Sequence, residues 1–385
     1  MSSTTARSRP TAIGSKPRLL LIGAGHAHLH LLHQSSLLSR FDVTLVDPGA
    51  FWYSGLASGV LAGDHSPATD RIDPATLCHG RGVALVRARL CALNTDARQA
   101  LLSNGTSLAF DRLGLNLGSA PALRSSDDEA SGDSAASLPG DKQTHWQIKP
   151  IPHLVRLRRS LERRFQRRQS VSVEILGAGA SGVEIACAIE ALGRRHQLAA
   201  GALTIRLRHR GSGPLPEAPA RARRYLLAAL ERRGILVVDS LHDRHLPASD
   251  IIDATGLGPP RGLERFGLPT IDGRGIAIDP SLKVQGTDGV FASGDCAALI
   301  DHPLPRLGVH GVRQGPVLAR NLIASLDPQA SLTSYRPPAR ALSIVNLGHG
   351  EALALYGNAW WGGRLASRLK RHLDLNFMQR TRRLR

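Results

Sequence analysis

Cysteine is scarce in this 385-residue sequence, which contains four. They lie far apart, and no two have the Cys-x-x-Cys spacing of zinc ribbons and dithiol redox sites. This excludes a disulfide-rich secreted scaffold and a structural zinc module, and it is typical of a protein of the reducing cytoplasm. The four residues are Cys78, Cys91, Cys187 and Cys296.

Long apolar runs are also missing. No segment approaches the roughly 20 consecutive apolar residues that a membrane-spanning helix needs, and residues 1–16 contain no apolar core of a signal peptide. Hydrophobic residues still make up 42% of the sequence, as in folded globular proteins. At roughly 100 to 200 residues per domain, the length predicts two or three domains.

Acidic residues and lysine are scarce as well. The sequence has 31 acidic and 49 basic residues, a formal net charge of +18, and only five of the basic residues are lysines. Such a charge attracts nucleic acids and anionic lipids, although an arginine excess is also typical of GC-rich codon usage. Aromatic residues form only 4% of the chain and do not alternate with the arginines of stretch 156–168. Without a nucleic-acid-binding motif, we expect no nucleic-acid partner.

Near the N-terminus, the apolar segment 18–22 runs into a glycine turn and then into a helical stretch that ends near Ser39. This pattern predicts the strand, tight turn and helix that open a dinucleotide-binding unit. Gly23 and Gly25 would let the backbone approach a pyrophosphate, whose charge would meet the N–H groups at the start of the helix.

The same unit continues with a second apolar strand, 42–46, that ends in Asp47. In dinucleotide-binding units an acid at this spacing binds a ribose hydroxyl, so we expect Asp47 to do so. The third glycine of the motif is replaced by His28, whose side chain must fit where the helix and the strand pack closely.

A second unit begins with the apolar strand 171–176. A complete Gly-x-Gly-x-x-Gly motif follows it and opens a helix, which is the context that makes this motif specific. The alternative is that this half of the chain has lost nucleotide binding and remains only as scaffold. The glycines are Gly177, Gly179 and Gly182.

The next strand of this unit, 203–207, is followed by Arg208, His209 and Arg210, and no acid stands at the ribose position. A carboxylate there favours NAD, whereas basic groups accommodate the 2′-phosphate of NADP. We therefore expect NADPH to be slightly favoured, with Arg208 at this position.

Two further segments add to the pattern. The buried strand that begins near Val290 ends in Gly294 and Asp295, and it would bring one carboxylate beside the first nucleotide site, where ligand hydroxyls could donate to it. Between the two units, stretch 125–137 is polar and rich in small residues, which predicts a surface loop or a disordered insert.

Six motifs in order resemble the FAD-dependent pyridine nucleotide oxidoreductases. Within them the sequence is most similar to the type II NADH dehydrogenase-like group, and closest to the subfamily associated with selenide, water dikinase. The resemblance covers about residues 18–378. Its motifs are Gly23-x-Gly25-His-Ala-His-x-His30, Tyr53-Ser-Gly55-x-x-x-Gly59, Gly177-x-Gly179-x-x-Gly182-Val-Glu184, Ala254-Thr-Gly256, Val290-Phe-Ala-x-Gly294-Asp295 and Val312-Arg-Gln314-Gly-Pro.

The resemblance implies that FAD lies along the first unit and that NAD(P)H lies across the second and delivers hydride to the flavin. It places Lys149 and Gln314 near the flavin, and it identifies no catalytic acid or base. The helix that opens near Arg313 and Gln314 would stabilise the reduced flavin. The implied FAD residues are Gly23, Gly25, His26, Asp47, Ser54, Gly55, Gly118, Asp295, Arg313 and Gln314. The implied NAD(P) residues are Gly177, Gly179, Gly182, Arg208 and Gly256.

The sequence also departs from parts of that superfamily. Residues 26–39 contain no cysteine, which excludes the dithiol relay of the disulfide reductases. Cys296 is the only cysteine beside a flavin motif and has no evident partner, so we interpret it as a packing residue. We expect no metal, because the histidines belong to a turn and helix already assigned to phosphate binding. These histidines are His26, His28, His30 and His33.

The C-terminal segment 360–385 predicts a basic amphipathic helix. Apolar residues recur at every fourth position and would form one stripe, while arginines dominate elsewhere. Such a helix could lie in the headgroup region of an anionic membrane, on the inner face of the plasma membrane, or dock its stripe on the protein. The stripe consists of Leu365, Leu369, Leu373 and Phe377.

The sequence thus predicts an α/β fold with two Rossmann-like domains in three layers and a C-terminal α/β extension. We expect a cytoplasmic FAD-dependent oxidoreductase that passes electrons from NAD(P)H to an acceptor such as a quinone. The alternatives are a non-catalytic flavoprotein adaptor linked to selenium metabolism, and an enzyme like sulfide:quinone oxidoreductase. The expected parts are a flexible N-terminus (1–16), an FAD domain (17–120 and 275–330), a flexible insert (121–144), an NAD(P) domain (145–274) and a C-terminal region (331–385).

Overall fold

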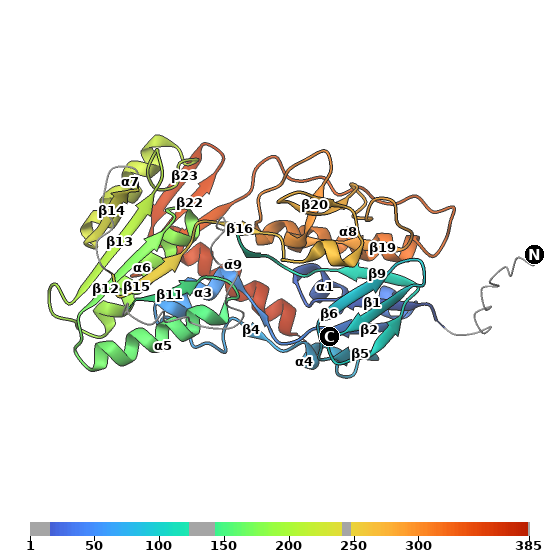
Figure 1. Ribbon diagram of the computed structural model, residues 1–385. Coiled ribbons are helices and arrows are strands. Elements are labelled where there is room, and N and C mark those ends of the chain that lie inside the picture. The colour runs from blue at the N-terminus through green and yellow to red at the C-terminus, as the bar shows by residue number, and fades with distance from the viewer. Residues whose placement is uncertain (1–15, 123–142, 241–247, 384–385) are drawn as a thin grey trace, which may run out of the picture.

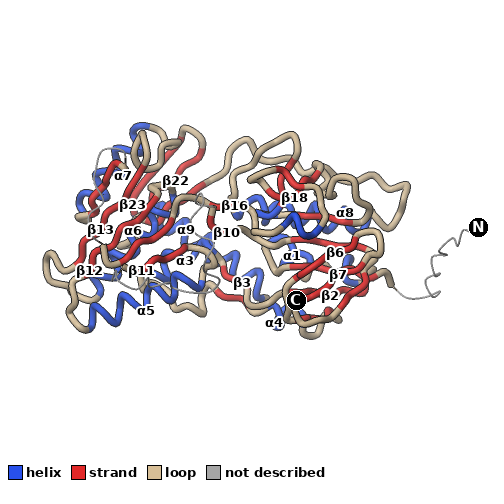
Figure 2. The backbone as a smooth tube through the Cα atoms, in the orientation of Figure 1, coloured by secondary structure: helices blue, strands red, loops and turns tan. Residues whose placement is uncertain are grey.

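The computed structural model describes residues 16–122, 143–240 and 248–383. The expected flexible N-terminus (1–16) and polar insert (121–144) lie almost wholly outside the described residues. Figures 1 and 2 show two α/β lobes side by side, with the last helix lying across their junction.

The first lobe is built on a five-stranded parallel sheet with the strand order β19-β9-β1-β2-β5. Continuous apolar runs such as 19–22 form its centre because other elements cover the sheet on both faces. Its strands are β1 (Arg18–Ile22), β2 (Asp42–Val46), β5 (Val83–Val86), β9 (Arg112–Leu115) and β19 (Val290–Ala292).

Helix α1 packs closely along α8 beside this sheet. Smaller elements complete the lobe, among them the antiparallel sheet β6-β7-β8 and the sheet β17-β18-β20. The helices are α1 (His26–Leu31), α2 (Ser35–Leu38), α4 (Pro74–Cys78) and α8 (Gly308–Ala324), with the 3-10 turns η1 (Leu263–Phe266) and η2 (Gly294–Cys296). The short strands are β6 (Leu90–Asn94), β7 (Gln99–Leu102), β8 (Ser107–Ala109), β17 (Thr270–Ile271), β18 (Gly275–Ile278) and β20 (Ala297–Leu299).

The second lobe repeats the architecture of the first. Its parallel sheet has the order β11-β15-β12-β13-β14, in which β15, β12, β13 and β14 correspond to β9, β1, β2 and β5. The strands are β11 (Thr144–Gln147), β12 (Val171–Leu176), β13 (Leu203–His209), β14 (Ile235–Asp239) and β15 (Asp250–Asp253). The helices are α5 (Pro152–Gln166), α6 (Ala180–Arg195) and α7 (Ala220–Arg232). The predicted fold class of two Rossmann-like units is therefore confirmed.

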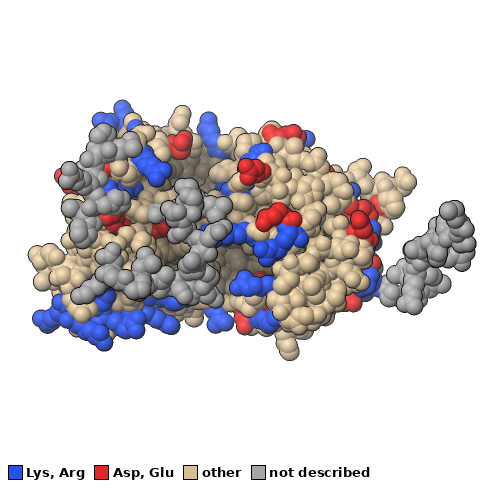
Figure 3. Space-filling model, in the orientation of Figure 1, with Lys and Arg blue, Asp and Glu red and all other residues tan. Residues whose placement is uncertain are grey.

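The arginine-rich stretch of the sequence forms α5. One face of this helix is buried, and its other face presents arginines to solvent, where Figure 3 shows lysine and arginine gathered along the lower edge of the second lobe. The buried residues are Leu154, Val155, Leu157, Leu161 and Phe165.

Several elements connect the two lobes. Helix α3 (Ser54–Leu61) lies in the chain between the antiparallel strands β3 (Phe51–Trp52) and β4 (Arg71–Ile72), and it packs on α5 and α6 of the second lobe. The short antiparallel pair β10 (Ala120–Pro121) and β16 (Leu257–Gly258) also joins them.

Core packing moves one expected boundary. Residues Leu263, Phe266 and Leu268 belong to the apolar core of the first lobe, so the chain returns to this lobe soon after β16. We expected this return at residue 275.

The C-terminal region contributes to both lobes. The antiparallel sheet β21 (Ser343–Asn346), β22 (Ala352–Tyr356) and β23 (Ala359–Gly363) packs on the second core, and α9 (Arg364–Arg382) then reaches the first core with Met378.

Helix α9 docks on the protein, and of the predicted stripe Phe377 takes part, stacked on the ring of Tyr53 at a centroid distance of 4.5 Å. Leu365 and Leu373 are 72% and 45% exposed. The buried residues lie on the neighbouring face of the helix, where polar groups take part in the contact. They are Ala366, Asp374, Met378 and Thr381.

Candidate functional site

The first glycine turn lies at the carboxyl end of β1 and is in close contact with the end of β9. Gly23 has φ of +88°, and a Cβ there would stand 2.4 Å from the backbone oxygen of Asn116. A Cβ on Gly25 would stand 2.1 Å from the side-chain oxygen of the same asparagine. Only glycine fits at both positions, as the motif predicts.

Asp47 holds this turn. Its carboxylate accepts hydrogen bonds from the N–H of Ala24 (2.7 Å) and the N–H of Gly49 (2.8 Å). A carboxylate has about four acceptor sites, and Asp47 is only partly buried, so it retains capacity for ribose hydroxyls.

His28 fits at the third glycine position because a strand makes room for it. A Cβ on Gly114 of β9 would lie 2.8 Å from His28 Nε2, so glycine there admits the ring. His28 Nδ1 lies 2.6 Å from the backbone oxygen of Gly23, and burial lowers the pKa of His28 to about 4. The neutral ring therefore donates its Nδ1–H to Gly23 and stabilises the turn.

The other histidines of this segment contact neighbouring helices. His26 and His30 pack against α8 at positions where that helix has glycine. A Cβ on Gly311 would lie 3.4 Å from His26, and a Cβ on Gly315 would lie 2.8 Å from His30. His33 Nε2 lies 2.9 Å from the backbone oxygen of Thr381 in α9.

Asp295 follows β19 and stands at the same end of the sheet as the glycine turn. Its carboxylate accepts a hydrogen bond from the hydroxyl of Ser119 (2.8 Å). The N–H of Gly294 donates to the side-chain oxygen of Gln314 in α8 (2.6 Å), which fixes this turn against the helix. Gly118 has φ of +76° and no atom within 4 Å of a Cβ, so its surroundings are open.

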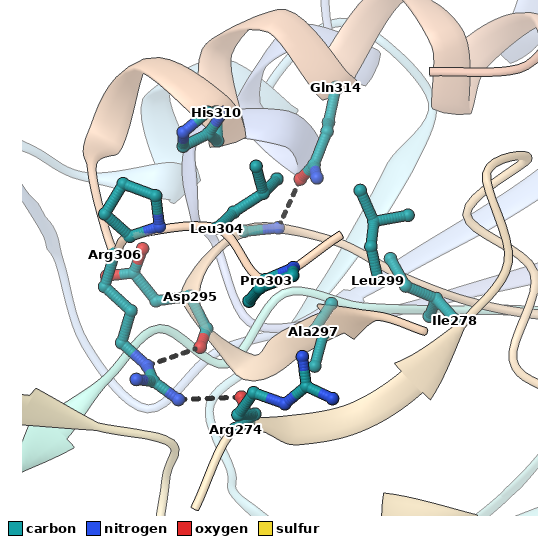
Figure 4. A pocket seen from close by; sticks show the side chains of 13 residues that line it. Arg274, Ile278, Asp295, Ala297, Leu299, Pro303, Leu304, Arg306, His310 and Gln314 are labelled. Carbon is teal, nitrogen blue, oxygen red and sulfur yellow. Dashed lines mark hydrogen bonds between the residues drawn. The ribbon is translucent and has the colours of Figure 1, made fainter. Parts of the chain in front are cut away.

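A small cavity of about 40 Å³ lies behind this turn (Figure 4). The guanidinium of Arg306 donates to the backbone oxygens of Asp295 and Arg274, and Figure 4 places His310 and Gln314 on the opposite side. Its lining includes Gly294, Asp295 and Gln314, so it adjoins the predicted flavin residues.

Lys149 approaches this site from the second lobe. Burial lowers its pKa, while the nearby carboxylate of Asp295 opposes that effect. The same lysine lowers the pKa of His26, so it lies near both residues. The structure thus brings the predicted Lys149 to the first nucleotide turn.

The remaining predicted flavin residues lie on α3 and α8. Ser54 begins α3 and is exposed, and Gly55 packs beneath the ring of Tyr53. Helix α8 begins at Gly308, more than a turn before the predicted opening, so Arg313 and Gln314 lie within it. Arg313 is exposed, whereas Gln314 is buried.

The second glycine turn, between β12 and α6, has the same design. A Cβ on Gly177 would lie 2.5 Å from the backbone oxygen of Ala254, and one on Gly182 would lie 1.8 Å from the backbone oxygen of Gly177. Gly179 and Gly256 have no atom within 4 Å of a Cβ, so space remains in front of the turn. The helix has no side-chain cap, and its first N–H groups are available to an anion.

The assignment of Arg208 to the ribose position is wrong by one residue. In the first unit the N–H of Gly23 donates to the backbone oxygen of Val46. In the second unit the N–H of Gly177 donates to the backbone oxygen of Arg208, so Arg208 corresponds to Val46. Its guanidinium is 2% exposed and pairs with Glu174 inside the lobe. Side chains alternate along a strand, and the equivalent of Asp47 is therefore His209.

The two units meet through residues that the sequence analysis did not identify as site residues. Glu184, in the second turn of α6, accepts hydrogen bonds from the N–H of Asn346 (2.7 Å) and from Ser58 of α3. Lys370 of α9 lies 3.9 Å from Glu184 and donates to the backbone oxygen of Gly55 (2.8 Å). One largely buried lysine of α9 thus links α6 to α3, the helix that lies between β3 and β4.

Asp374 extends this network towards the first turn. Its carboxylate accepts hydrogen bonds from Lys370 (3.1 Å) and from the hydroxyl of Tyr53 (2.9 Å). The pKa of Lys370 is raised overall. Burial alone would lower this pKa, but the carboxylates of Glu184 and Asp374 have the larger, opposite effect. Burial, with a contribution from Asp374, raises the pKa of Tyr53. Lys370 was recognisable only as one of five lysines in an arginine-rich chain.

Cys296 has the packing role that we predicted. It is buried, the N–H of Leu117 donates to its sulfur (3.3 Å), and burial raises the pKa of its thiol to about 11. A thiol in this state is a poor nucleophile at neutral pH. All four cysteines are free.

Both turns fit the pyrophosphate of a dinucleotide. Each leaves an uncapped helix N-terminus, each has glycine where a side chain would collide with backbone, and the buried side-chain oxygen of Asn116 has no hydrogen-bond partner among the described residues. The first unit adds Asp47 and Asp295, two carboxylates that suit the hydroxyls of a ribose and of a ribityl chain.

Comparison with known proteins agrees with this geometry. The sequence profile of the pyridine nucleotide-disulphide oxidoreductase family matches residues 17–315. NADH dehydrogenase-like protein Rv1812c of Mycobacterium tuberculosis is 28% identical over 387 residues, which cover 89% of this chain and 88% of the relative.

Two solved structures share the fold. NDH2 of Plasmodium falciparum in complex with NADH has a TM-score of 0.77 at 12% identity and covers 95% of this chain and 97% of its own. The sulfide:quinone oxidoreductase of Aquifex aeolicus has a TM-score of 0.76 at 12% identity and covers 95% and 91%.

Proposed function

Because the chain belongs to the pyridine nucleotide-disulphide oxidoreductase family, we propose that it is an FAD-dependent oxidoreductase that takes hydride from NAD(P)H and passes electrons to a quinone. The observation that carries this proposal is the presence on one chain of two uncapped glycine turns of the same design, at Gly23 and Gly25 and at Gly177 and Gly182. The names of the relatives, which include an NADH dehydrogenase-like protein and a sulfide:quinone oxidoreductase, support the choice of donor and acceptor.

The first unit would hold FAD. The uncapped N–H groups after Gly25 meet the pyrophosphate, Asp47 accepts from the adenosine ribose, and Asp295 accepts from the ribityl chain. FAD, when bound, supplies the two-electron redox chemistry. Lys149 brings a positive charge to this end of the site, where it favours negative charge on the ligand.

The second unit would hold NAD(P)H at Gly177, Gly179 and Gly182. The two units of this chain fix the distance and angle between their ligands, and hydride transfer depends mainly on that alignment. No cysteine pair is needed for this reaction, which agrees with the buried, protonated thiol of Cys296.

Reduction of a quinone by NAD(P)H consumes one proton in addition to the hydride. Lys370 keeps a proton at its Nζ because two carboxylates raise its pKa, and it is linked through Asp374 to the hydroxyl of Tyr53. Lys370 and Tyr53 therefore both keep their protons at neutral pH, and this network holds the charge and position of its members.

The donor would be NADPH rather than NADH. His209 stands where the first unit has Asp47, Asp239 of β14 is paired in register with His209, and the exposed Arg210 follows, so Arg210 is the basic group offered to a 2′-phosphate.

The C-terminal helix would bring the enzyme to a membrane. Leu365 and Leu373 remain exposed after α9 has docked, and basic residues flank them. Among the described residues, none of the helices combines the length and the apolar character needed to cross a bilayer.

The function is tested by reconstitution with FAD followed by rapid mixing with NADPH or NADH. We expect the flavin absorbance near 450 nm to bleach and then to recover when a quinone is added, with oxygen and selenium compounds as competing acceptors. A protein that binds FAD but is reduced by neither donor would support the non-catalytic adaptor instead. A Cys296→Ser variant that keeps its quinone reductase activity would argue against the mechanism of sulfide:quinone oxidoreductases.

A further inference from the structure

Arg306 lies between β20 and α8, two residues before that helix begins, and its side chain is partly buried. Its guanidinium donates to four backbone oxygens in three separate segments. The distances are 3.3 Å to Asp295 in η2, 3.1 Å to Leu257 in β16, and 3.2 and 2.7 Å to Gly273 and Arg274 in the turn between β17 and β18. Figure 4 shows the bonds to Asp295 and Arg274. One side chain therefore holds three segments at a single point.

The bond to Leu257 reaches one of two strands on which the chain crosses between the lobes. The chain leaves the first lobe through β10 and returns from the second lobe through β16, and these two strands pair with each other. Figure 2 shows both at the junction of the lobes. The N–H of Ala122 extends the pair by donating to the backbone oxygen of Gly256 (3.2 Å). A group that fixes β16 thus also fixes the strand paired with it.

A guanidinium suits this position. It has five N–H donors in a rigid planar fork, so one side chain can reach the oxygens of several segments at once. Hydrogen bonds from a charged donor are roughly twice as strong as those from a neutral donor. The other three bonds of Arg306 are made to the first lobe, one of them to Asp295 itself. Arg306 therefore joins the crossing strands to the turn that carries Asp295.

The transfer of hydride depends on the distance and angle between the two ligands, and a displacement of about 1 Å can lower such a rate about a hundredfold. Each glycine turn lies within one lobe, whereas the placement of one turn relative to the other depends on the junction. We propose that Arg306 is a positioning residue for the transfer of hydride, with its two electrons, from NAD(P)H to FAD. It holds β16 on the turn of Asp295 and so fixes the second unit relative to the first. The proposal rests on the proposed function, which assigns the two ligands.

Arg306→Gln removes the fork and tests its role in alignment. We expect the rate constant for reduction of bound FAD by NADPH, measured by stopped flow, to fall at least about tenfold. The Kd values for FAD and for NADPH should change by less than about threefold, because the contacts of each glycine turn lie within one lobe. A loss of FAD affinity as large as the loss of rate would show that Arg306 supports only the FAD site, and it would overturn the proposal.

The matched control is Arg112→Gln. Arg112 is also partly buried and donates to the backbone oxygen of Asp111 (2.8 Å) and to the hydroxyl of Ser325 (2.8 Å), but these partners belong to the first lobe. Its replacement should change the rate of reduction by less than about threefold. Equal losses of rate in Arg112→Gln and Arg306→Gln would count against a specific role at the junction.

Hydrogen exchange in the apoprotein, followed by mass spectrometry, tests the clamp without turnover. In wild type the amide of Ala122 should exchange at least about tenfold more slowly than an unstructured amide, because it exchanges when β10 and β16 separate. In Arg306→Gln it should exchange at least about tenfold faster than in wild type, while the amides of β12 stay unchanged. Rapid exchange of Ala122 in wild type overturns the proposal even if the variant fails to fold. A wild-type protein that is reduced by neither nicotinamide contradicts the proposed function instead, and the exchange result still decides whether the clamp exists.

Discussion

Asp70 is buried without a partner and should make the stability of this protein depend on pH. It precedes β4, its side chain is 0% exposed, and neither carboxyl oxygen has a hydrogen-bond partner in another described residue. Arg382 lies close by, but its guanidinium donates to the backbone oxygens of Ala68, Thr69 and Arg71. Burial raises the pKa of Asp70 to about 7, which its own backbone N–H and the charge of Arg382 oppose.

The direction of the effect follows from the two pKa values of Asp70. The folded protein holds the proton up to about pH 7, whereas the unfolded chain releases it near its usual value of 3.8. Stability is therefore highest below the unfolded pKa and is lost as the pH rises through the folded pKa. A shift of about three pKa units corresponds to roughly 4 kcal/mol over the whole titration, of which about 2 to 3 kcal/mol falls between pH 5 and pH 8.

Asp70→Asn removes this titration and keeps the size of the side chain. We expect its free energy of unfolding, measured by urea titration at pH 5, 6, 7 and 8, to rise relative to wild type by about 2 to 3 kcal/mol over that range. The matched control is Asp73→Asn. Asp73 accepts from the N–H of Ala75, and this hydrogen bond, together with Arg87, lowers its pKa; asparagine keeps the cap and loses only the partly exposed ion pair, so the variant should be less stable than wild type by less than about 1 kcal/mol at every pH from 5 to 8. A difference between Asp70→Asn and wild type that stays constant from pH 5 to pH 8 would refute the reasoning.

Three further substitutions, the first with a matched control, test the site. Lys370→Met leaves two carboxylates without their cation, and we expect a loss of about 3 kcal/mol or more in the free energy of unfolding. The control is Lys283→Met: Lys283 lies 4.0 Å from an exposed aspartate, so its replacement should change the free energy of unfolding by less than about 1 kcal/mol. Equal effects of the two would argue against a structural role for the Lys370 network. Arg210→Gln should weaken binding of 2′,5′-ADP at least fivefold in calorimetry and leave 5′-ADP unchanged, and an equal loss for both would count against 2′-phosphate recognition. Gly182→Ala, whose Cβ would stand 1.8 Å from a backbone oxygen, should retain FAD but lose reduction by NAD(P)H at least tenfold in stopped flow, and normal reduction would contradict the second site.

Much of the fold could be predicted because its signals are local. Segments 18–22, 42–46 and 171–176 were expected as strands and are strands with the same bounds, since each is a short apolar run ended by a turn signal. Glycine motifs are equally local, because the close approach that requires them occurs within one strand, turn and helix.

The errors arose where a one-residue difference or a distant contact decides the outcome. Strand β13 extends to His209, two residues beyond the expected end at 207, and this places Arg208 inside the lobe instead of at the ribose position. The tail was expected to dock by its apolar stripe or to present it to a membrane; it docks by Asp374, Met378 and Phe377 and leaves Leu365 and Leu373 exposed, because the hydroxyl of Tyr53 is a partner for Asp374.

Sequence alone determined that the chain folds into two dinucleotide-binding units, because the relevant glycines and apolar strands interact mainly with their near neighbours in the chain. Tertiary structure alone decided how those units face each other. Lys370 lies 186 residues from Glu184 and 315 from Gly55, and no local pattern encodes their contact. The same holds for His28 and Gly114, whose mutual fit appears only when helix and strand are packed together.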